Sequence, residues 1–421
     1  MTTKVYPAGA NGTVTAPPSK SMTQRAIAAA LLAKGETVLL NPSFCKDSLA
    51  ALGMIRALGA EIEKKDVSLN IRGGLRAVST RLHCGESGLA MRMFSPIAAL
   101  LPREVEFTGE GSLPKRPVSM IEEALLQLGA GFRSQGGFLP FVIQGPVSGG
   151  KASIDGSLSS QLLTGLLMAL PLAASDSEIH VRNLKSKPYV SMTLQLLSDF
   201  GIGIENQNFE VFKISGNQKY NPRTYLIEGD WSGAAFLLVA GAVSGNVVVE
   251  GLSAYSLQSD VAILDALLLA GAQPVIAENR IEIAKAELKA FKFDATECPD
   301  LFPPLAALAA SCPGTTEIAG VERLIHKESN RALAITGELH KSGIEAGTTG
   351  DVMWIKGGKA NGGSSDSHND HRIAMMSAVL ALNAKNPVEI TQAECVEKSY
   401  PGFYDDFRKL GVAVEFKEDG L

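Results

Sequence analysis

Hydrophobic and polar positions follow a pattern that returns six times along this chain. In each copy a helical pattern ends at a small or apolar residue followed by glycine, and a short strand pattern comes next. The glycines recur roughly 70 residues apart, which predicts a six-fold internal repeat. A glycine in this place suits the left-handed conformation that closes a helix. The six copies lie at 57–62, 127–132, 199–204, 269–272, 341–345 and 409–414, around Gly59, Gly129, Gly201, Gly271, Gly343 and Gly411.

A second set of helices interleaves with these glycines. It is rich in small and apolar residues on all sides, so we expect its members to be buried. Each is followed by a turn and a strand, and then by an amphipathic helix that we expect to cover the outside of a sheet. A third strand or a hairpin, such as 138–143, completes the unit. The apolar helices are predicted over 26–32, 90–101, 162–174, 234–242, 305–310 and 373–384.

Six units divide naturally into two groups of three. We place one lobe at 19–225, and a second lobe at 1–18 together with 226–421. The first strand, in pieces at 4–6 and 13–16, is assigned to the C-terminal group because Pro17-Pro18 separates it from the helix that follows. The pattern therefore predicts an α/β protein of two lobes with a cleft between them.

Composition and charge narrow the class of protein. The chain has 421 residues, 45% of them hydrophobic and 20% charged, which is typical of a globular α/β protein of two domains. A net charge of −5 argues against a nucleic-acid partner. The five cysteines lack CxxC spacing and predict reduced thiols. With neither a targeting segment nor an apolar run long enough to cross a bilayer, we expect no membrane partner and a cytoplasmic protein.

Candidate chemistry lies where helices begin. Pro17-Pro18 is followed by Ser19-Lys20-Ser21 and then by an apolar helix. The side chain of Lys20 therefore lies close to the free backbone N–H groups and the positive end of the helix dipole. Arg25 follows one turn later. This arrangement favours phosphate or carboxylate.

Other predicted helices open with similar polar groups. The buried helices open at 86–88, 159–161, 230–233, 300–303 and 369–372, and outer helices at 115–117, 185–188, 326–329 and 397–399. If their positive ends gather at the cleft, a ligand with several anionic groups fits the pocket better than a neutral one. The cations concerned are Lys20, Arg25, Arg92, Arg116, Lys327, Arg331, Arg372 and Lys398.

Each of these residues alone also has an ordinary structural interpretation. Asp300 can cap a helix, and Glu328 can pair with Arg331 three residues on. Motifs of other classes are missing from the sequence: it has no nucleotide P-loop, no third glycine after Gly109 and Gly111, and no Gly-x-Ser-x-Gly elbow. His368 and His371 lack partners at metal spacing, so we expect neither metal nor cofactor.

Ten motifs, in order along nearly the whole chain, resemble the 5-enolpyruvylshikimate-3-phosphate synthase family of enolpyruvyl transferases. They are Ser19-Lys20-Ser21 with Arg25, Ser87-Gly88 through Met91-Arg92, Lys115-Arg116-Pro117, Asp155-Gly156-Ser157 with Ser159-Ser160-Gln161, Ser186-Lys187-Pro188-Tyr189, Glu228-Gly229-Asp230, Pro299-Asp300, Lys327-Glu328-Ser329-Asn330-Arg331, Asn369-Asp370-His371-Arg372 and Lys398-Ser399-Tyr400-Pro401.

The resemblance implies a fold and two substrates. The fold is a two-lobed, inside-out α/β barrel of six βαβαββ repeats, three per lobe, with the active site in the interlobe cleft and no cofactor or metal. We expect a monomer. By family match, shikimate 3-phosphate is held by Ser21, Arg25, Ser159, Ser160, Gln161, Ser186, Asp300 and Lys327. Phosphoenolpyruvate is held by Lys20, Gly88, Arg116, Gln161, Arg331, Arg372 and Lys398.

The implied reaction requires two proton transfers. The 5-hydroxyl of shikimate 3-phosphate loses a proton as it attacks C2 of phosphoenolpyruvate, and C3 gains one. We assign the hydroxyl's partner to Asp300 and the C3 proton donor to Glu328, with Lys20 as a further proton carrier. Phosphate then leaves the tetrahedral adduct, and Lys20, Arg116 and Lys398 can neutralise its charge.

Two stretches of the sequence depart from the family pattern. Its usual Gly-Asn-Ala/Ser-Gly-Thr reads Gly85-Glu86-Ser87-Gly88-Leu89 here, which removes a hydroxyl and adds an anion close to the expected phosphoenolpyruvate site. Pairing of Glu86 with an arginine would stop it repelling the ligand. Affinity for phosphoenolpyruvate and for the inhibitor glyphosate depends on this pair of changes. Ile325 stands where a basic residue is common, near the expected shikimate phosphate.

Two alternatives remain open from the sequence. The sister transferase that acts on UDP-N-acetylglucosamine shares the fold. Chains of that family have Lys-Asn after the first strand and a reactive cysteine in a mobile loop. Here Ser-Lys-Ser replaces the former and 110–115 contains no cysteine. A non-catalytic repeat protein that binds anions is the alternative from another class, and it has no need of Asp300 and Glu328 facing one cleft.

Overall fold

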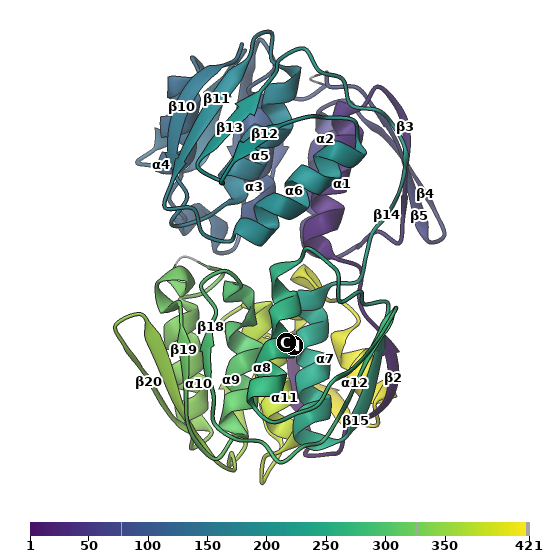
Figure 1. Ribbon diagram of the computed structural model, residues 1–421, viewed down its shortest axis with the longest axis vertical. Coiled ribbons are helices and arrows are strands. Elements are labelled where there is room, and N and C mark those ends of the chain that lie inside the picture. The colour runs from purple at the N-terminus through teal and green to yellow at the C-terminus, as the bar shows by residue number, and fades with distance from the viewer. Residues whose placement is uncertain (77, 326, 418–421) are drawn as a thin grey trace. The chain divides into compact units, whose positions relative to one another are not determined.

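The computed structural model describes residues 1–76, 78–325 and 327–417. They divide into two compact units. The middle unit is Pro18–Ile227, and the terminal unit combines Met1–Pro17 with Glu228–Leu421. Figure 1 shows that each unit has sheets around a group of central helices.

In the described residues, the strands form six four-stranded sheets with one pairing scheme: one parallel pair and two antiparallel pairs. Three sheets belong to the middle unit. The first has the order β14 (Thr224–Leu226), β3 (Gly35–Leu40), β5 (Ser68–Gly73), β4 (Glu61–Lys65). The second is β6 (Arg81–His83), β7 (Glu104–Thr108), β9 (Phe138–Gln144), β8 (Gly131–Gln135), and the third is β10 (Gly150–Asp155), β11 (Ser177–Arg182), β13 (Val211–Ile214), β12 (Glu205–Gln207).

The terminal unit repeats the scheme with strands from both ends of the chain. Its first sheet is β16 (Val275–Ala277), β17 (Arg280–Ala284), β15 (Asn246–Glu250), β2 (Asn11–Thr15). The second is β18 (Lys292–Asp294), β19 (Gly314–Ala319), β21 (Val352–Gly357), β20 (Glu345–Thr349). The third is β22 (Gly363–Asp366), β23 (Val388–Thr391), β1 (Thr2–Val5), β24 (Val414–Lys417), so residues of the N-terminal strand lie between two C-terminal ones.

The apolar helices lie at the centre of each unit, as predicted. In the middle unit α1 (Lys20–Leu32), α3 (Gly88–Ala98) and α5 (Gln161–Ala169) pack together, with α3 in contact with both of the others. In the terminal unit α7 (Trp231–Ser244), α9 (Phe302–Ala310) and α11 (His371–Leu382) contact one another pairwise. Every residue of α11 is buried, because a helix without a polar face has no side suited to water.

The second helix of each repeat packs differently from the prediction. These helices are α2 (Lys46–Ala57), α4 (Ser119–Gln127), α6 (Lys187–Asp199), α8 (Ile263–Leu269), α10 (Arg331–Lys341) and α12 (Phe403–Lys409). Rather than covering the outside of one sheet, α4 contacts β8 and β10, and α10 contacts β20 and β22. α12 likewise contacts both β2 and β24. These three helices lie between successive sheets, because sheets arranged around central helices leave a gap where two of them meet. Six 3-10 segments link these elements: η1 (Leu113–Lys115), η2 (Leu170–Leu172), η3 (Ser259–Ala262), η4 (Pro299–Leu301), η5 (Val321–Leu324) and η6 (Ala393–Lys398).

The glycines that marked the repeat close these second helices. All six have positive φ, between 79° at Gly343 and 98° at Gly59. This region is costly for residues with a Cβ atom, which explains why glycine recurs at this point. The prediction of their left-handed conformation is confirmed.

Two of the six repeats take their first strand from a distant segment. β14 pairs in parallel with β3, although β14 lies about two hundred residues after the beginning of α1, the helix that precedes β3. β2 likewise pairs in parallel with β15, and β1 pairs with both β23 and β24. In each unit, one sheet is therefore completed by a strand next to a point where the chain passes from one unit to the other.

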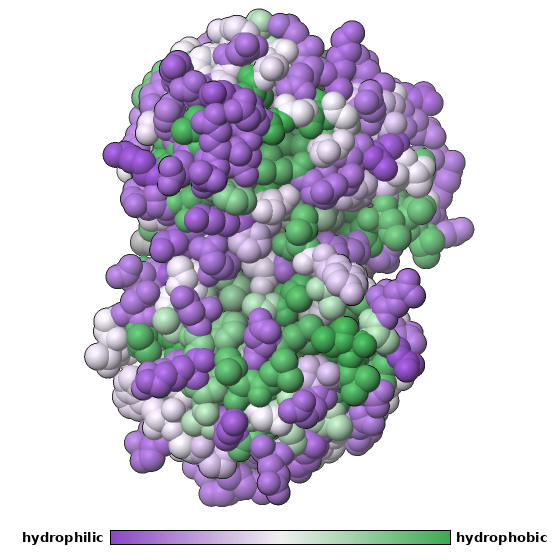
Figure 2. All heavy atoms as spheres, in the orientation of Figure 1, coloured by the Kyte–Doolittle hydropathy of each residue, from purple (hydrophilic) through white to green (hydrophobic). Residues whose placement is uncertain are grey.

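Each unit has a mostly polar surface. Figure 2 shows hydrophilic residues over much of the visible surface and a hydrophobic region on the terminal unit. Large exposed apolar residues of that unit include Leu268 and Leu269 of α8 and Val275 and Ile276 of β16. The predicted amphipathic character of the second helices is thus incomplete at α8.

Candidate active site

Lys20 is the first residue of α1, and it is held by an ion pair. Ser19 caps the helix by accepting a hydrogen bond from the Met22 amide at 3.3 Å, which the preceding prolines favour by ending the strand. Lys20 Nζ lies 3.0 Å from Asp47 Oδ2 in the first turn of α2, and both side chains are almost buried. Asp47 therefore fixes the position of the ammonium group.

Arg25 lies inside the middle unit and ties three helices together. Its Nη1 donates to the Ser21 carbonyl at 2.9 Å, its Nε to Thr193 Oγ1 at 2.9 Å, and its Nη2 to Thr164 Oγ1 at 3.4 Å. These partners are neutral. Burial lowers the pKa of the Arg25 guanidinium to about 10, because the partners do not replace the lost water.

A second group of cations converges on the beginning of α3. Arg92 Nη1 donates to Gln161 Oε1 at 2.9 Å, and Arg116 Nη2 donates to Ser112 Oγ at 3.2 Å. A Cβ atom on Gly88 would lie 2.6 Å from Arg116 Nη1 and 2.9 Å from Arg92 Nη1. Gly88 therefore allows both guanidinium groups to approach the N-terminal turn of α3, where anions are favoured.

Three of the four predicted serines lie at the entrances to α5 and α6, while Ser21 lies in the first turn of α1. Ser159 Oγ accepts a hydrogen bond from the Gln161 amide at 3.2 Å, and Ser160 is the N-cap residue of α5. Ser186 precedes α6 in the left-handed conformation, with φ of 58°, and is buried. A non-glycine residue rarely adopts this φ, and such residues concentrate at functional sites.

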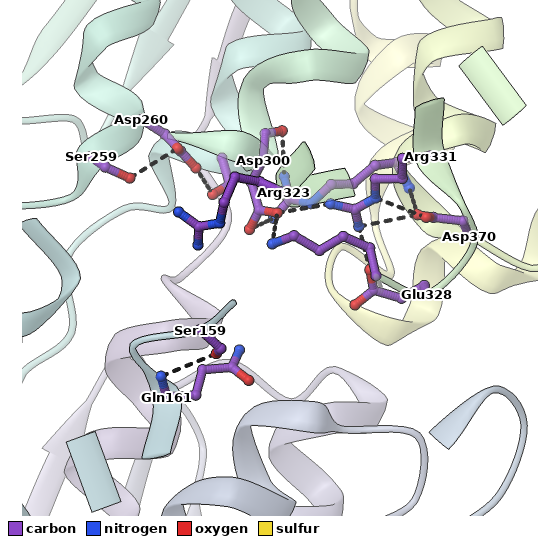
Figure 3. Close-up of polar contacts among 12 residues, drawn as sticks. Ser159, Gln161, Ser259, Asp260, Asp300, Arg323, Glu328, Arg331 and Asp370 are labelled. Atoms are coloured by element: carbon purple, nitrogen blue, oxygen red, sulfur yellow. Dashed lines mark hydrogen bonds and ion pairs between the residues drawn. The ribbon is translucent and has the colours of Figure 1, made fainter. Parts of the chain in front are cut away.

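Asp300 is the centre of the cluster in the terminal unit. Its Oδ1 lies 2.8 Å from Arg331 Nη1 and 3.2 Å from Lys327 Nζ, and its Oδ2 lies 3.2 Å from Arg372 Nη2. Figure 3 shows the Asp300 carboxylate beside the Arg331 side chain. Three cations from two different helices and the loop before α10 thus contact one carboxylate that is 23% exposed.

Arg331, the first residue of α10, is the most heavily paired cation. Its Nε lies 2.8 Å from Asp370 Oδ2, and its Nη2 donates to Glu328. Burial lowers the pKa of Arg331, but the attraction of Asp370, Glu328 and Asp300 outweighs that effect and raises the pKa well above its usual value. Arg331 therefore stays positively charged, and its guanidinium group contacts both Asp300 and Glu328.

The two lysines of this cluster are held differently. Burial lowers the pKa of Lys327, and the neighbouring Asp300 opposes that shift. Lys398 is buried and donates from Nζ to the Asn369 carbonyl at 2.7 Å, in the loop before α11. Both lysines thus point to the region where α10 and α11 begin.

Several residues lie outside the helix beginnings at which the sequence placed them. Arg116 falls between η1 and α4, which starts at Ser119. Lys398 ends η6, five residues before α12, and Lys327 and Glu328 precede α10. These four residues lie just before their helices, and α4, α10 and α12 begin a few residues later than the polar pattern suggested, whereas α6 begins at Lys187 within the predicted stretch. His326 lies outside the described residues.

Two contacts escaped the sequence analysis. Asp47 was not considered, because no local pattern relates it to Lys20, 27 residues earlier. Asp370 was noted only as part of a polar run, yet it is fully buried and holds both Arg331 and Ser329. An acidic residue directly before a wholly apolar helix was the available signal.

The residues that depart from the family pattern differ in their burial and surroundings. Glu86 Oε2 lies against Gly111, where an added Cβ atom would be only 1.9 Å away. Leu89 is buried in α3, and Ile325 is 49% exposed. The interaction of Glu86 with an arginine stays a prediction.

Two features are absent from the described part of the chain. No group of three or more His, Cys, Asp or Glu side chains there could hold a metal ion. No helix there has the length and hydropathy that a membrane span needs.

Comparison with known proteins gives one consistent result. Residues 6–407 match the family described as EPSP synthase (3-phosphoshikimate 1-carboxyvinyltransferase). A protein of Clostridium kluyveri named 3-phosphoshikimate 1-carboxyvinyltransferase is 40% identical over 98% of this chain and 97% of its own length. A protein of the same name from Methanocorpusculum labreanum is 40% identical over 96% of each chain.

Solved structures share the fold. EPSP synthase from Acinetobacter baumannii superposes with a TM-score of 0.81 at 27% identity, covering 99% of this chain and 100% of that one. The enolpyruvyl transferase NikO from Streptomyces tendae has a TM-score of 0.79 at 16% identity over 98% of each chain, a likeness of fold alone.

Proposed function

This chain belongs to the EPSP synthase (3-phosphoshikimate 1-carboxyvinyltransferase) family, and we propose that the cation clusters of its two units serve that reaction. The enzyme transfers the enolpyruvyl group of phosphoenolpyruvate to the 5-hydroxyl of shikimate 3-phosphate and releases phosphate. Both substrates carry phosphate and carboxylate groups, so their recognition calls for several fixed cations.

The proposed binding residues come from both units. In the middle unit Ser21, Arg25, Ser159, Ser160, Gln161 and Ser186 hold shikimate 3-phosphate, while Lys20, Gly88, Arg116 and again Gln161 hold phosphoenolpyruvate. In the terminal unit Asp300 and Lys327 hold the first substrate, and Arg331, Arg372 and Lys398 hold the second. The neutral partners of Arg25 and the close approach of Arg92 and Arg116 at Gly88 support an anion site in the middle unit.

Two carboxyl groups move the protons. As the 5-hydroxyl oxygen bonds to C2 of phosphoenolpyruvate, its proton passes to Asp300 while C3 takes a proton from Glu328. In the second step the adduct returns a C3 proton to Glu328, and the C2–O bond to phosphate breaks, which restores the C2–C3 double bond. The proton held by Asp300 leaves with the phosphate, so both carboxyl groups return to their starting states. Lys20, Arg116 and Lys398 offset the charge of the departing phosphate, and Lys20 is a further proton carrier.

The single observation that carries these roles is the shared guanidinium of Arg331. Its Nη1 contacts Asp300 at 2.8 Å and its Nη2 contacts Glu328, so two carboxyl groups are fixed a few ångströms apart in one unit. A repeat protein that only bound anions would gain nothing from carboxylates in a cationic site, since they repel its ligand.

The test is phosphate release by purified protein with shikimate 3-phosphate and phosphoenolpyruvate. Glu328→Gln keeps the shape of the side chain and should still bind shikimate 3-phosphate, while kcat falls by about 100-fold or more because the C3 proton donor is gone. Asp300→Ala should behave similarly. Unchanged turnover in either variant removes that residue from the proposal.

The same assay separates the two alternatives. Release of phosphate with UDP-N-acetylglucosamine and not with shikimate 3-phosphate would favour the sister transferase, and none with either acceptor would favour a binding protein. The range Glu110–Lys115 has no cysteine, which supports the shikimate 3-phosphate acceptor.

We also propose that the protein acts as a cytoplasmic monomer. All residues assigned to the reaction belong to one chain, and the five cysteines are free and buried, as suits a reducing compartment. Light scattering of the purified protein should give a mass close to 44.4 kDa. Twice that mass would contradict the monomer.

A further inference from the structure

Glu338 is a buried acid of α10 that the proposed mechanism does not use. Its side chain is 2% exposed, and both of its oxygens are engaged. Oε1 lies 2.7 Å from His368 Nε2 and 2.8 Å from Lys341 Nζ, while Oε2 accepts a hydrogen bond from the Asp366 amide at 2.9 Å. Lys341 belongs to the same helix, but Asp366 ends β22 and His368 follows that strand. Glu338 therefore joins α10 to the segment that leads from β22 into α11.

That segment contains two consecutive residues other than glycine with positive φ. The φ angles are 52° at His368 and 53° at Asn369, in the left-handed region that residues with a Cβ atom rarely adopt. Two side chains support this backbone: the His368 amide donates to Asp366 Oδ1 at 2.8 Å, and the Asn369 amide donates to Ser367 Oγ at 3.2 Å. Such a conformation persists only where its surroundings hold it, and Glu338 supplies a contact from outside the segment.

The Asn369 carbonyl is the point at which this segment meets the proposed site. It accepts the hydrogen bond from Lys398 Nζ at 2.7 Å, and Lys398 lies 29 residues further along the chain. Asp370, the next residue, is held separately, because its carboxylate accepts hydrogen bonds from Arg331 Nε at 2.8 Å and from Ser329 Oγ at 3.0 Å. A shift of the backbone at Asn369 should therefore move the partner of Lys398 while Asp370 and Arg331 keep theirs.

We propose that His368 is a positioning residue: its contact with the buried Glu338 fixes the Asn369 carbonyl, which in turn fixes the ammonium group of Lys398 for phosphoenolpyruvate. This inference rests on the role proposed above for Lys398. It assigns His368 to the placement of a cation and not to substrate contact. It therefore predicts a loss of affinity for phosphoenolpyruvate, with little effect on shikimate 3-phosphate.

Two substitutions of His368 separate the contact with Glu338 from the backbone conformation. Asparagine tolerates a positive φ well, but its side-chain N–H group ends nearer the backbone than Nε2 does, so His368→Asn loses the contact. His368→Gln carries an amide nitrogen the same number of bonds from Cα as Nε2, so it can still donate to Glu338. The contact predicts a defect in the asparagine variant alone, whereas the backbone conformation predicts a defect in the glutamine variant.

The measurement is steady-state phosphate release with one substrate varied and the other saturating. In His368→Asn the KM for phosphoenolpyruvate should rise roughly fivefold or more, because the ammonium group of Lys398 loses its fixed position, while the KM for shikimate 3-phosphate should change less than about twofold. In His368→Gln both values should stay within about twofold of the wild type. His368→Gly, which suits a positive φ and removes the side chain, should repeat the result of His368→Asn and decides the matter if that variant fails to fold.

His180→Asn is the matched control. His180 Nε2 also lies against a glutamate, at 2.6 Å from Glu178 Oε1, but this pair is on β11 of the middle unit and both side chains are partly exposed. The control should leave both KM values unchanged. An effect equal to that of His368→Asn would overturn the inference, because it would not be specific to the segment before α11.

Two further results would overturn it. One is a wild-type KM for phosphoenolpyruvate in His368→Asn, and the other is an equal rise of both KM values, which indicates a general structural defect. Lys398→Met distinguishes the two proposals: if its KM for phosphoenolpyruvate is unchanged, the role of Lys398 fails. If that KM rises while His368→Asn keeps the wild-type value, only the role of His368 fails.

Discussion

The two buried arginines, Arg25 in the middle unit and Arg331 in the terminal unit, have opposite surroundings. Both are almost fully inaccessible to water. Arg25 donates to two threonine hydroxyls and a carbonyl, and burial lowers its pKa to about 10. Arg331 donates to three carboxylates, and its pKa is raised well above the ordinary value.

The difference indicates how the two units divide the work. A buried charge with neutral partners is more stable when an anion comes close, so the middle unit has electrostatic energy to gain from a phosphate or carboxylate. The charge of Arg331 is already matched, and its role is to hold Asp370, Asp300 and Glu328 in place. The middle unit is suited to attracting anions, and the carboxylates that Arg331 holds in the terminal unit include the two proposed above to move protons.

The largest effect should come from Arg331→Met. This change leaves Asp370, which is fully buried, without its arginine, together with Asp300 and Glu328. Because breaking a buried ion pair strands the partner charge, the free energy of unfolding should fall by about 3 to 5 kcal/mol. Urea denaturation followed by circular dichroism measures it.

Arg133→Met is the control for that loss. Arg133 pairs with Glu104 at 2.9 Å but is 67% exposed, so its removal should leave the free energy of unfolding almost unchanged. If both variants lose the same amount, the carboxylates around Arg331 do not depend on it.

Asp260→Asn sharpens the comparison within the terminal unit, because Asp260 is a buried carboxylate bonded to serines. Its pKa is raised from 3.8 to about 6 in the folded protein, so the native state binds more protons than the unfolded state between these values. The wild type therefore loses stability from this group as pH rises through 6. The stability advantage of the asparagine variant should grow by about 2 kcal/mol between pH 4.5 and 7.5.

Urea denaturation of both proteins at the two pH values measures this difference. A constant offset between the variant and the wild type would show that Asp260 has the same proton affinity in the folded and unfolded chains.

Arg25→Met should lower the stability much less than Arg331→Met. It removes three hydrogen bonds to neutral groups, but it also relieves the desolvation of a charge, so the net loss should be about 1 kcal/mol. The kcat/KM for shikimate 3-phosphate should nevertheless fall more than tenfold, since an anion-binding charge is lost. A stability loss equal to that of Arg331→Met would abolish the contrast between the two arginines.

The repeat and the central helices were predictable because they depend on local signals. A glycine such as Gly201 at the end of a helix, and helices such as α7 without a polar face, report their own conformation and burial. The beginnings of α1, α5 and α11 followed from Ser19, Ser160 and Asp370 at their caps. Such features need only neighbours within one helical turn.

The rest depends on contacts between distant segments. No residue near Lys20 in the sequence indicates that Asp47 is its partner. Likewise, no residue near Arg92 indicates its hydrogen bond to Gln161, 69 residues away. The positions of Arg116 and Lys398 before their helices depend on how each turn packs between two sheets. Family resemblance supplied the names of such residues, but it did not supply their partners.

The strands β1 and β2 have a consequence for biosynthesis. They are synthesised before the other strands of the two units, yet β2 pairs with β15, and β1 pairs with β23 and β24, which are synthesised after all the others. Residues 18–227 hold all the strand partners of their own three sheets. Residues 1–17 therefore stay unpaired while the middle unit can already assemble, and the terminal unit is completed only when β24 emerges.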